Sequence, residues 1–193
     1  MAEVNVSAPA LHVSGAEARC REDADRAAFE AFYGVAFPKV YGFVRCQGTS
    51  VEAAQEIVSL AFLKAYSNWH RAPRGDGDMA WVFRIAHNTL IDYWRVDRRH
   101  EEAAVPIDQL GPLRAAADSP ERAYERKQQA ANVLKFLGGL PPDDRVVLAL
   151  KFAGQRNNRE IAAILGLSEG AVSMRLLRAL RRMRERMTGA DEA

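Results

Sequence analysis

Two stretches of the chain place arginine side chains at helical spacing, and the chemistry of their neighbours suits a nucleic acid. Between residues 79 and 99, the outer face of an expected helix gathers Trp81, Arg84, Asn88, Arg95, Arg98 and Arg99. Arginine neutralises a backbone phosphate, asparagine can pair with a base edge, and an indole ring stacks on an unpaired base. The alternative for this face is a solvated helix surface with one partly buried tryptophan.

The sharpest local pattern lies in residues 157–187. Asn157 and Glu160 form a capping pair for a short helix, and Gly166 with Ser168 makes a turn into a longer one. The longer helix has a buried stripe of Val172, Leu176, Leu180 and Met183. Its arginines fall outside that stripe: Arg175, Arg178, Arg181, Arg182 and Arg186. This pattern predicts a helix-turn-helix whose second helix lies in the major groove of duplex DNA.

Enzymatic patterns are present only in incomplete form. The segment from Gly166 to Gly170 matches G-x-S-x-G, but that motif requires a strand before the serine, and here a helix precedes it. His100-Glu101-Glu102 lacks the second histidine of a zinc-protease helix. The histidines show no ligand spacing (His12, His70, His87 and His100), and there is no P-loop or dinucleotide fingerprint. We therefore expect Ser168 to be a helix cap, and expect no covalent chemistry, cofactor or metal.

Composition limits the class of protein. The chain has 193 residues, of which 48% are hydrophobic and 27% charged, which is typical of one ordinary globular domain or two small ones. Cys20 and Cys46 are too few for a disulfide framework, and they fit a reducing cytoplasm. No signal peptide and no apolar run long enough to cross a membrane is expected.

Charge is distributed unevenly behind a net value of +2. Residues 80–99 carry a net charge of +2 and residues 145–193 carry +5, whereas residues 100–144 between them carry −3. Two separated basic zones indicate two contacts on a polyanion. Solvated helix faces remain the alternative, because charge alone does not distinguish them.

Helical periodicity dominates, so the predicted fold class is all-α with two small helical domains joined by a flexible linker. The expected parts are a mobile arm at residues 1–25, a front block at 26–99, a linker at 100–119, a rear block at 120–187 and a tail at 188–193. The linker contains Pro106, Gly111 and Pro112 among alanines and acids. Ser119 is expected to cap a helix that ends at Gly138-Gly139.

The front block is expected to contain four helices before the linker. A first helix should end near Ala36 and another begin at Pro38, because proline removes a helix hydrogen bond. Thr49 with Glu52 forms a capping-box pattern for the helix that follows, which runs to about Trp69. The last helix, residues 79–99, has a core face of Val82, Ile85, Ala86, Thr89, Leu90, Tyr93 and Val96.

The helix that starts near residue 50 carries two different faces. Its core stripe is Ala54, Ile57, Val58, Ala61, Phe62, Ala65 and Trp69. Leu60 and Leu63 lie off that stripe, beside Glu52, Glu56 and Ser59. Exposed leucines among acids favour a partner surface, although single exposed leucines are common on protein surfaces.

Both blocks, in this order, resemble the extracytoplasmic-function group of bacterial RNA polymerase sigma factors. The front block is similar to region two of that family in Phe62-Leu63-Lys64-Ala65-Tyr66 and from Ala80 to Asn88. The rear block is similar to region four from Leu140 to Met187, most specifically from Ile161 to Ser168. The presence of both regions, with no third region between them, makes the resemblance specific.

The resemblance implies a division of labour between the blocks. Region two of the family binds the clamp coiled coil of core RNA polymerase and recognises the minus-ten promoter element as a melted strand. Region four recognises the minus-thirty-five element as duplex DNA and binds the polymerase flap. Many members are held inactive by an anti-sigma protein, so the expected partners are core polymerase, promoter DNA and such an inhibitor, without membrane insertion.

Three sets of site residues follow from the helix faces and the resemblance together. The arginine face of residues 79–99 becomes the minus-ten reader, with Asn88 on the position that contacts the strand and the loop Arg71–Asp78 on the segment that captures a flipped base. The residues expected to bind core polymerase are Glu52, Glu56, Ser59, Leu60 and Leu63. The minus-thirty-five set is Asn157, Asn158, Glu169, Ala171, Ser173, Met174, Arg175, Leu177, Arg178 and Arg181.

Three rival functions remain open on the sequence. A helix-turn-helix regulator, with the front block as a sensor or dimerisation domain, would bind duplex DNA without polymerase. A hydrolase would lose turnover when Ser168 is replaced by alanine. An RNA-binding adaptor would prefer RNA to promoter DNA in competition.

Overall fold

The structure, a computed structural model, describes residues 15–73, 75, 77–97 and 133–190. Its helices are α1 (Gly15–Arg45), α2 (Val51–Ser67), the 3-10 helix η1 (Trp69–Arg71), α3 (Gly77–Asp97), α5 (Pro142–Phe152), α6 (Asn158–Leu165) and α7 (Glu169–Ala190). Residues 133–138 form one further helical segment. Within these ranges every regular element is helical, which confirms the all-α class. The expected linker, residues 100–119, lies outside the described residues.

Helices α1, α2 and α3 pack together into a front lobe, residues 15–97. All seven residues of the predicted stripe are buried, six of them on α2 (Ala54, Ile57, Val58, Ala61, Phe62 and Ala65). The seventh, Trp69, lies in η1, because α2 ends at Ser67. A polar contact ties α2 to α3, because Lys64 Nζ donates to Thr89 Oγ1 at 3.1 Å. Small and branched side chains at helical spacing therefore fix how this lobe is packed.

The N-terminus of α2 differs by one residue from the predicted cap. Ser50, not Thr49, accepts from the backbone N–H of Ala53 at 3.0 Å. The Thr49 hydroxyl is buried and donates to the Val44 carbonyl at 3.0 Å, at the C-terminal end of α1. The prediction that Thr49 caps the helix is wrong, because its hydroxyl donates to a carbonyl in the last turn of α1, which also accepts from the backbone N–H of Gln47.

Helix α1 is continuous through Pro38, so the predicted break at this residue is wrong. A proline inside a helix costs about 3 kcal/mol. Val40, Phe43 and Val44 follow it and are fully buried in the front lobe. Burying side chains of this size contributes roughly 1.5–3 kcal/mol each, which outweighs the proline. The helix also extends back to Gly15, into residues that the sequence assigned to an arm.

Helices α5, α6 and α7, preceded by residues 133–138, form a rear lobe, residues 133–190. The capping box of α6 is confirmed, with Asn157 Oδ1 accepting from Glu160 N and the Glu160 carboxylate accepting from Asn157 N. Gly166 ends α6 in the left-handed conformation, with φ +67°. The predicted helix-turn-helix is therefore present, and its local signals were correct.

Two ion pairs fasten α7 to α5. Arg182 Nη1 donates to Asp144 Oδ2, and the Asp144 side chain is buried. Arg175 Nη1 lies 3.1 Å from Asp143 Oδ2, and that carboxylate is mostly exposed. Two consecutive acids of α5 thus hold α7, Asp144 from inside the lobe and Asp143 from its surface.

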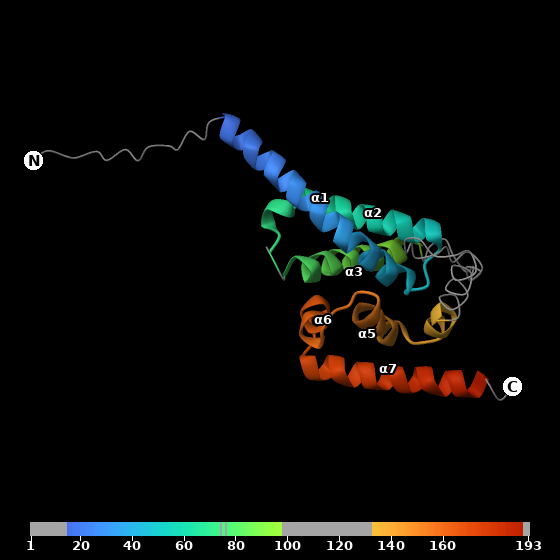
Figure 1. The fold of residues 1–193 in the computed structure, drawn as a ribbon. Helices are drawn as coiled ribbons and strands as arrows, with labels where there is room; N and C mark the ends of the chain where they lie inside the picture. The colour runs from blue at the N-terminus through green and yellow to red at the C-terminus, as the bar shows by residue number, and fades with distance from the viewer. Residues whose placement is uncertain (1–14, 74, 76, 98–132, 191–193) are drawn as a thin grey trace, which may run out of the picture.

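The two lobes pack directly against each other. Helix α3 contacts α6, and α1 contacts α5, so that α3 lies between α2 and the rear lobe (Figure 1). Phe83 on α3 is fully buried, although it lies off the core face predicted for this helix. The buried apolar residues of both lobes form one continuous cluster. The described chain therefore has a shared core at the boundary between its two helical domains.

Replacing Asp144 with asparagine should lower the free energy of unfolding by about 2 kcal/mol, because it removes the charge that pairs with Arg182 in a buried position. Asp143→Asn is the matched control and should cost less than about 1 kcal/mol, since its carboxylate is exposed. Urea unfolding followed by circular dichroism measures both. Equal losses in the two variants would contradict the assignment of Asp144 as the internal anchor of α7.

Candidate nucleic-acid and partner interfaces

On the predicted minus-ten face of α3, some side chains are exposed to solvent and others contact neighbouring residues. Asn88 and Arg95 are exposed, and Arg95 Nη1 lies 3.7 Å from Asp92 Oδ1. Trp81 is half-buried, with its ring 6.3 Å from that of Trp69. Arg84 donates to the carbonyl of Ala163 on α6. Arg98 and Arg99 lie outside the described residues, so the structure places four of the six predicted side chains together on one helix.

The segment between η1 and α3 is only partly described. Arg71 and Pro73 are exposed, Ala72 between them is buried, and Gly75 has φ +83°. A positive φ is strained for residues other than glycine, so this turn requires Gly75. The predicted base-capturing loop leads directly from η1, which contains Trp69, to the start of α3. Positions 74 and 76 lie outside the described residues.

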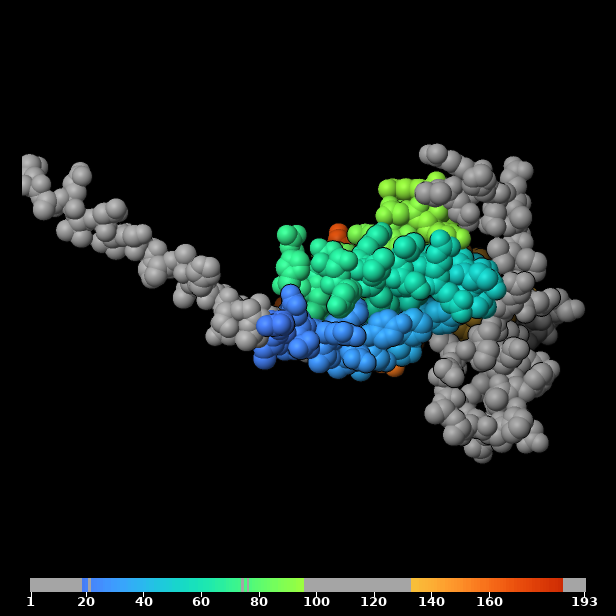
Figure 2. Space-filling view, turned by 90° about the horizontal axis from the view of Figure 1, so that it is seen from above, coloured from blue at the N-terminus to red at the C-terminus, as the bar shows by residue number. Residues whose placement is uncertain are grey.

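The outer face of α2 is open, as the sequence predicted. Glu52, Glu56, Ser59, Leu60 and Leu63 are all exposed. Figure 2 views this side and shows α1 and α2 side by side across it, with the rear lobe almost hidden beneath. The five residues recur at helical spacing, so they make one continuous surface on the side of the molecule away from α7.

Two tyrosines extend this apolar surface, and the sequence analysis missed them. Tyr66 on α2 and Tyr33 on α1 are both exposed. Each ring rests edge-on against a phenylalanine, Tyr66 on Phe29 at 5.0 Å and Tyr33 on Phe62 at 4.7 Å. The signal that could have found Tyr66 is its position one turn after Leu63 on the same helix.

The recognition helix α7 presents one open face to solvent. Ser173, Met174, Leu177, Arg178 and Arg181 are exposed at helical spacing, and Glu169 is exposed at the start of the helix. Ala171 is half-buried. Arg175 differs from the other arginines of the predicted set, because its side chain is only 28% exposed and pairs with Asp143.

The two asparagines at the start of α6 make bonds within the rear lobe. Asn157 is the cap of α6. Asn158 Nδ2 donates to Ser173 Oγ at 3.0 Å, and Asn158 Oδ1 accepts from Lys151 Nζ at 3.2 Å. Asn158 thereby links α6 to both α5 and α7. Both polar groups of the Asn158 side chain are therefore engaged within the rear lobe in this structure.

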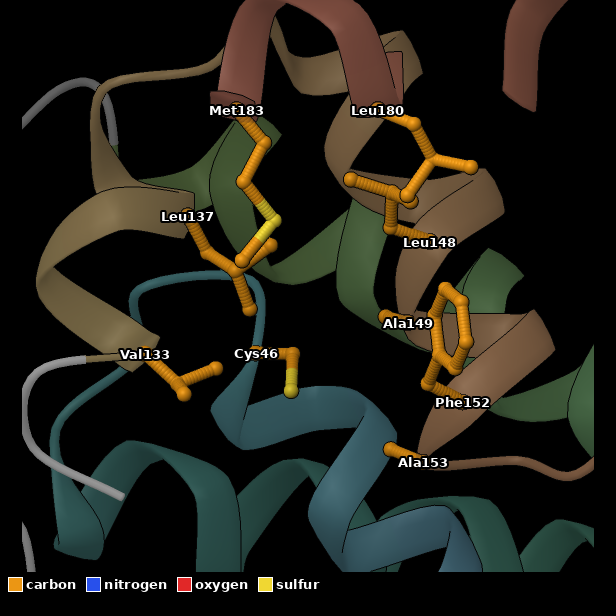
Figure 3. A pocket seen from close by; sticks show the side chains of 9 residues that line it. All are labelled: Cys46, Val133, Leu137, Leu148, Ala149, Phe152, Ala153, Leu180 and Met183. Carbon is orange, nitrogen blue, oxygen red and sulfur yellow. The ribbon is translucent and has the colours of Figure 1, made fainter. Parts of the chain in front are cut away.

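An apolar pocket with a volume of about 370 Å³ opens between the two lobes (Figure 3). Leu180 and Met183 reach it from α7, Leu148, Ala149, Phe152 and Ala153 from the end of α5, Val133 and Leu137 from residues 133–138, and Cys46 from the residue after α1. The prediction that Leu180 is buried is wrong, because it borders this opening and is 44% exposed. Exposed Phe152 adds to the same apolar rim.

Two titratable groups lie where the lobes meet. Burial raises the pKa of the Cys46 thiol to about 11, against a smaller opposing effect of Arg45. Burial also lowers the pKa of His87 on α3, while the charge of Asp143 on α5 acts in the opposite direction. Both groups are therefore uncharged near neutral pH. In both cases the main cause is burial, so the surroundings of these two side chains, near the end of α1 and on α3, have low polarity.

The structure argues against a nucleophilic role for Ser168. Its hydroxyl oxygen accepts from the N–H of Ala171 at 3.2 Å, and α6, a helix, precedes it where a nucleophile elbow needs a strand. Within the described ranges, no group of histidines, cysteines and carboxylates has the arrangement of a metal site. Among the described helices, none combines the length and apolar character needed to cross a membrane.

Comparison with known families matches both lobes. A family model described as Sigma-70 region 2 matches residues 21–100, and one described as Sigma-70, region 4 matches residues 130–183. The ECF RNA polymerase sigma factor RpoE of Cereibacter sphaeroides is 31% identical over 172 residues, which cover 87% of this chain and 91% of that protein. The RNA polymerase sigma-E factor of Streptomyces coelicolor is 33% identical over 139 residues, or 72% of this chain and 73% of that protein.

Solved structures share the fold. The sigma factor RpoE of Bartonella quintana, in complex with the anti-sigma factor NepR, superposes with a TM-score of 0.66 at 22% identity, covering 83% of this chain and 97% of that one. CnrH in complex with the cytosolic domain of CnrY gives a TM-score of 0.63 at 22% identity, covering 85% of this chain and 90% of that one. Both superpositions span most of the chain.

Proposed function

The chain belongs to the sigma-70 family, in its extracytoplasmic-function group of RNA polymerase sigma factors, and from this premise we propose how its surfaces divide the work of initiation. It binds core polymerase and directs transcription from promoters with minus-ten and minus-thirty-five elements. The observation that supports the division is that α2 and α7 lie on opposite sides of the molecule (Figure 1), and each carries a row of exposed side chains. A polymerase and a DNA duplex can therefore be held without competing for one surface.

The α2 face is proposed as the contact with the clamp coiled coil. Leu60 and Leu63 supply apolar area, and Glu52 and Glu56 supply charge at its edge. An apolar centre with a polar rim is the arrangement found in protein interfaces. Exposed Tyr66 lies on the same helix and enlarges the apolar part.

The minus-ten element is assigned to α3 and the loop before it. Asn88 is exposed on α3 and offers an amide to a base edge, and Trp81 offers part of an indole for stacking. Melting is driven by capture, because holding an unstacked base offsets the few kcal/mol that unstacking costs. Arg84 and Arg95 supply positive charge along the same helix.

The minus-thirty-five element is assigned to the open face of α7. Arg178 and Arg181 contact phosphates there, and Ser173, Met174 and Leu177 face the groove. Arg175 is proposed to orient α7 through Asp143. Once one lobe holds the promoter, the other contact becomes intramolecular, so neither needs high affinity alone.

The apolar pocket is proposed as the site for the polymerase flap. All of its lining residues except Cys46 belong to the rear lobe, so most of the pocket persists without the front lobe (Figure 3). It is lined by Leu180 and Met183 of α7, whereas the residues proposed to contact DNA are exposed ones, from Glu169 to Arg181, that do not line the pocket. Flap and duplex can accordingly bind the rear lobe together.

The protein is proposed to act by binding alone, in the cytoplasm, with no covalent step and with an anti-sigma protein as a further partner. An electrophoretic assay with core polymerase and a promoter library tests the function. A shifted complex that selects a subset of promoters is the expected result. Promoter binding without core would favour an independent regulator, and core binding without promoter selectivity would remove the proposal.

Leu63→Asp should weaken binding to core polymerase at least tenfold, because it places a charge in the apolar part of the proposed clamp contact. Val35→Asp is the matched control, since Val35 on α1 is 59% exposed and Leu63 is 61% exposed. Fluorescence anisotropy with labelled protein measures both affinities. An equal loss in the two variants would show a general effect of the added charge.

Arg178→Glu should weaken binding of holoenzyme to minus-thirty-five duplex and lower the slope of log affinity against log salt by about one. Lys135→Glu makes the same charge change at an exposed site elsewhere in the rear lobe and should leave the slope unchanged. Titrations at several salt concentrations give both slopes. Unaltered promoter binding in the Arg178 variant would refute its place on the DNA face.

Asn88→Ala should reduce open-complex formation roughly tenfold, because one base-edge contact contributes about 1–3 kcal/mol. Binding to core polymerase should stay at the wild-type value, since Asn88 is exposed and lies on α3 rather than α2. Permanganate footprinting measures melting, and anisotropy measures core binding. Loss of core binding would identify Asn88 as a folding residue.

A further inference from the structure

Three polar side chains of the predicted minus-thirty-five set are engaged within the rear lobe. The Asn158 amide donates to the Ser173 hydroxyl, which itself donates to the carbonyl of Glu169, both at 3.0 Å. Arg175 Nη1 lies 3.1 Å from Asp143 Oδ2. These groups therefore have little hydrogen-bonding capacity left for the edge of a base.

Beside these groups, α7 exposes a strip of three residues without a polar side chain. Gly170, Met174 and Leu177 recur at intervals of four and three residues, so they follow one another along one side of the helix. Met174 is 57% exposed and Leu177 is 64% exposed, so most of their apolar surface faces solvent. Val172 and Leu176 are buried and lie two residues either side of Met174, which places the apolar strip opposite the core of the lobe.

Gly170 leaves the first turn of α7 without a side chain. An added Cβ would have no heavy atom within 4 Å, so packing inside the protein does not require glycine at this position. Glycine is also unfavourable inside a helix relative to alanine. What glycine does provide there is room for another molecule to approach the helix backbone closely.

Positive charge borders the apolar strip and indicates what covers it. Arg178 lies one turn beyond Met174, and Arg181 lies one turn beyond Leu177. Both arginines are exposed, although Arg178 Nε donates to the Met174 carbonyl at 3.4 Å and Arg181 Nε lies 3.9 Å from the carboxylate of Glu185. A complementary partner has negative charge on either side of apolar groups, and the major groove of DNA has both between its two phosphate chains.

The apolar group that a base presents in the major groove is the 5-methyl group of thymine. An apolar side chain that contacts this methyl group separates thymine from cytosine without any hydrogen bond. The apolar strip occupies the second, sixth and ninth residues of α7, and the N-terminal part of a recognition helix lies nearest the base edges. Its position and its chemistry therefore suit the same contact.

We propose that Met174 and Leu177 select thymines of the minus-thirty-five element by contact with their methyl groups, and that Gly170 lets the start of α7 approach the groove closely. The proposal rests on the proposed function, because it names what the α7 face recognises. Arg178 and Arg181 supply affinity for phosphates that does not depend on the base sequence. Selectivity at the positions under the apolar strip then comes from apolar contact.

A selection experiment gives the DNA sequence that the protein prefers. Holoenzyme assembled with the full chain is bound to a pool of promoter duplexes randomised at the minus-thirty-five element, and the bound fraction is sequenced. Thymine should be enriched at two or more positions, on one strand or the other. A selected sequence without enriched thymine would overturn the proposal.

Deoxyuridine then tests the methyl groups themselves. It keeps every hydrogen-bonding group of thymine and lacks only the 5-methyl group, so each enriched thymine is replaced by it singly. Holoenzyme binding should weaken roughly three- to fourfold at each contacted position, which corresponds to leaving one methyl group unburied. Replacement of a thymine between the two promoter elements is the control and should change nothing. Equal affinity for thymine and uracil at every enriched position would overturn the proposal.

Substitutions in the apolar strip connect the methyl effect to particular side chains. Met174→Gln and Leu177→Asn keep side chains of similar size but make them polar, and each should bring the affinity ratio of thymine to uracil close to one at its own position. Met174→Leu stays apolar and should retain the ratio. Arg181→Gln is the matched control on the same helix and should weaken binding of both duplexes equally, so that the ratio is unchanged.

Gly170→Ala separates a binding role from a structural one. Alanine is the better helix former and its Cβ would meet no neighbour, so the melting temperature of the protein should stay the same or rise. Binding of the selected duplex should nevertheless weaken several-fold, because the methyl group would stand between the helix backbone and the groove. Unchanged DNA binding in this variant would contradict the close approach.

The outcomes distinguish this proposal from the proposed function. If holoenzyme selects no sequence at the minus-thirty-five element, the assignment of that element to α7 fails, and the thymine contacts fail with it. If a sequence is selected but uracil binds as well as thymine, only the present proposal is wrong. If Met174→Gln leaves DNA binding unchanged but converts a dimer of the free protein to a monomer in size-exclusion chromatography, the apolar strip is a contact between two copies of the chain, which also overturns the proposal.

Discussion

Burial of α3 on two sides is the constraint on which the arrangement of the molecule depends. Val82, Ala86 and Leu90 pack within the front lobe, and Phe83 packs toward the rear lobe. One helix therefore belongs to both cores. Its remaining surface is what the minus-ten element can use, and part of that surface carries the Arg84 contact to α6. The faces of α2 and α7 stay open because they lie on the outer sides of this central helix.

Patterns within one helix were predictable, and contacts between distant segments were not. The buried stripe of α2 and the capping box of α6 follow from spacing and cap chemistry, and both are confirmed. The predictions for Pro38 and Thr49 were wrong because contacts outside the expected helix decide both. Packing after Pro38 keeps α1 continuous, and the Thr49 hydroxyl donates to the Val44 carbonyl at the end of α1. Phe83 was missed for the same reason, since the partner that buries it is in the other lobe.

Two arginines of α7 show what the sequence could not predict at the candidate DNA site. Arg175 and Arg178 lie on one helix, and the sequence assigned both to DNA. In the structure Arg175 pairs with Asp143, whereas Arg178 is exposed. Spacing shows which face of a helix a residue occupies, but the acids that pair with it come from α5. The sequence pattern therefore predicts which residues lie on the outer face of the helix. Only the fold shows which of those arginines pair with an acid of the same lobe, as Arg175 does, and which are exposed, as Arg178 is.

The shared core also bears on how tightly polymerase must bind. Burying a phenylalanine side chain contributes roughly 1.5–3 kcal/mol, and each polar contact between the lobes adds about 1 kcal/mol. A partner that holds the lobes apart must offset these contributions from its own contacts, which reduces its apparent affinity by the fraction of open protein.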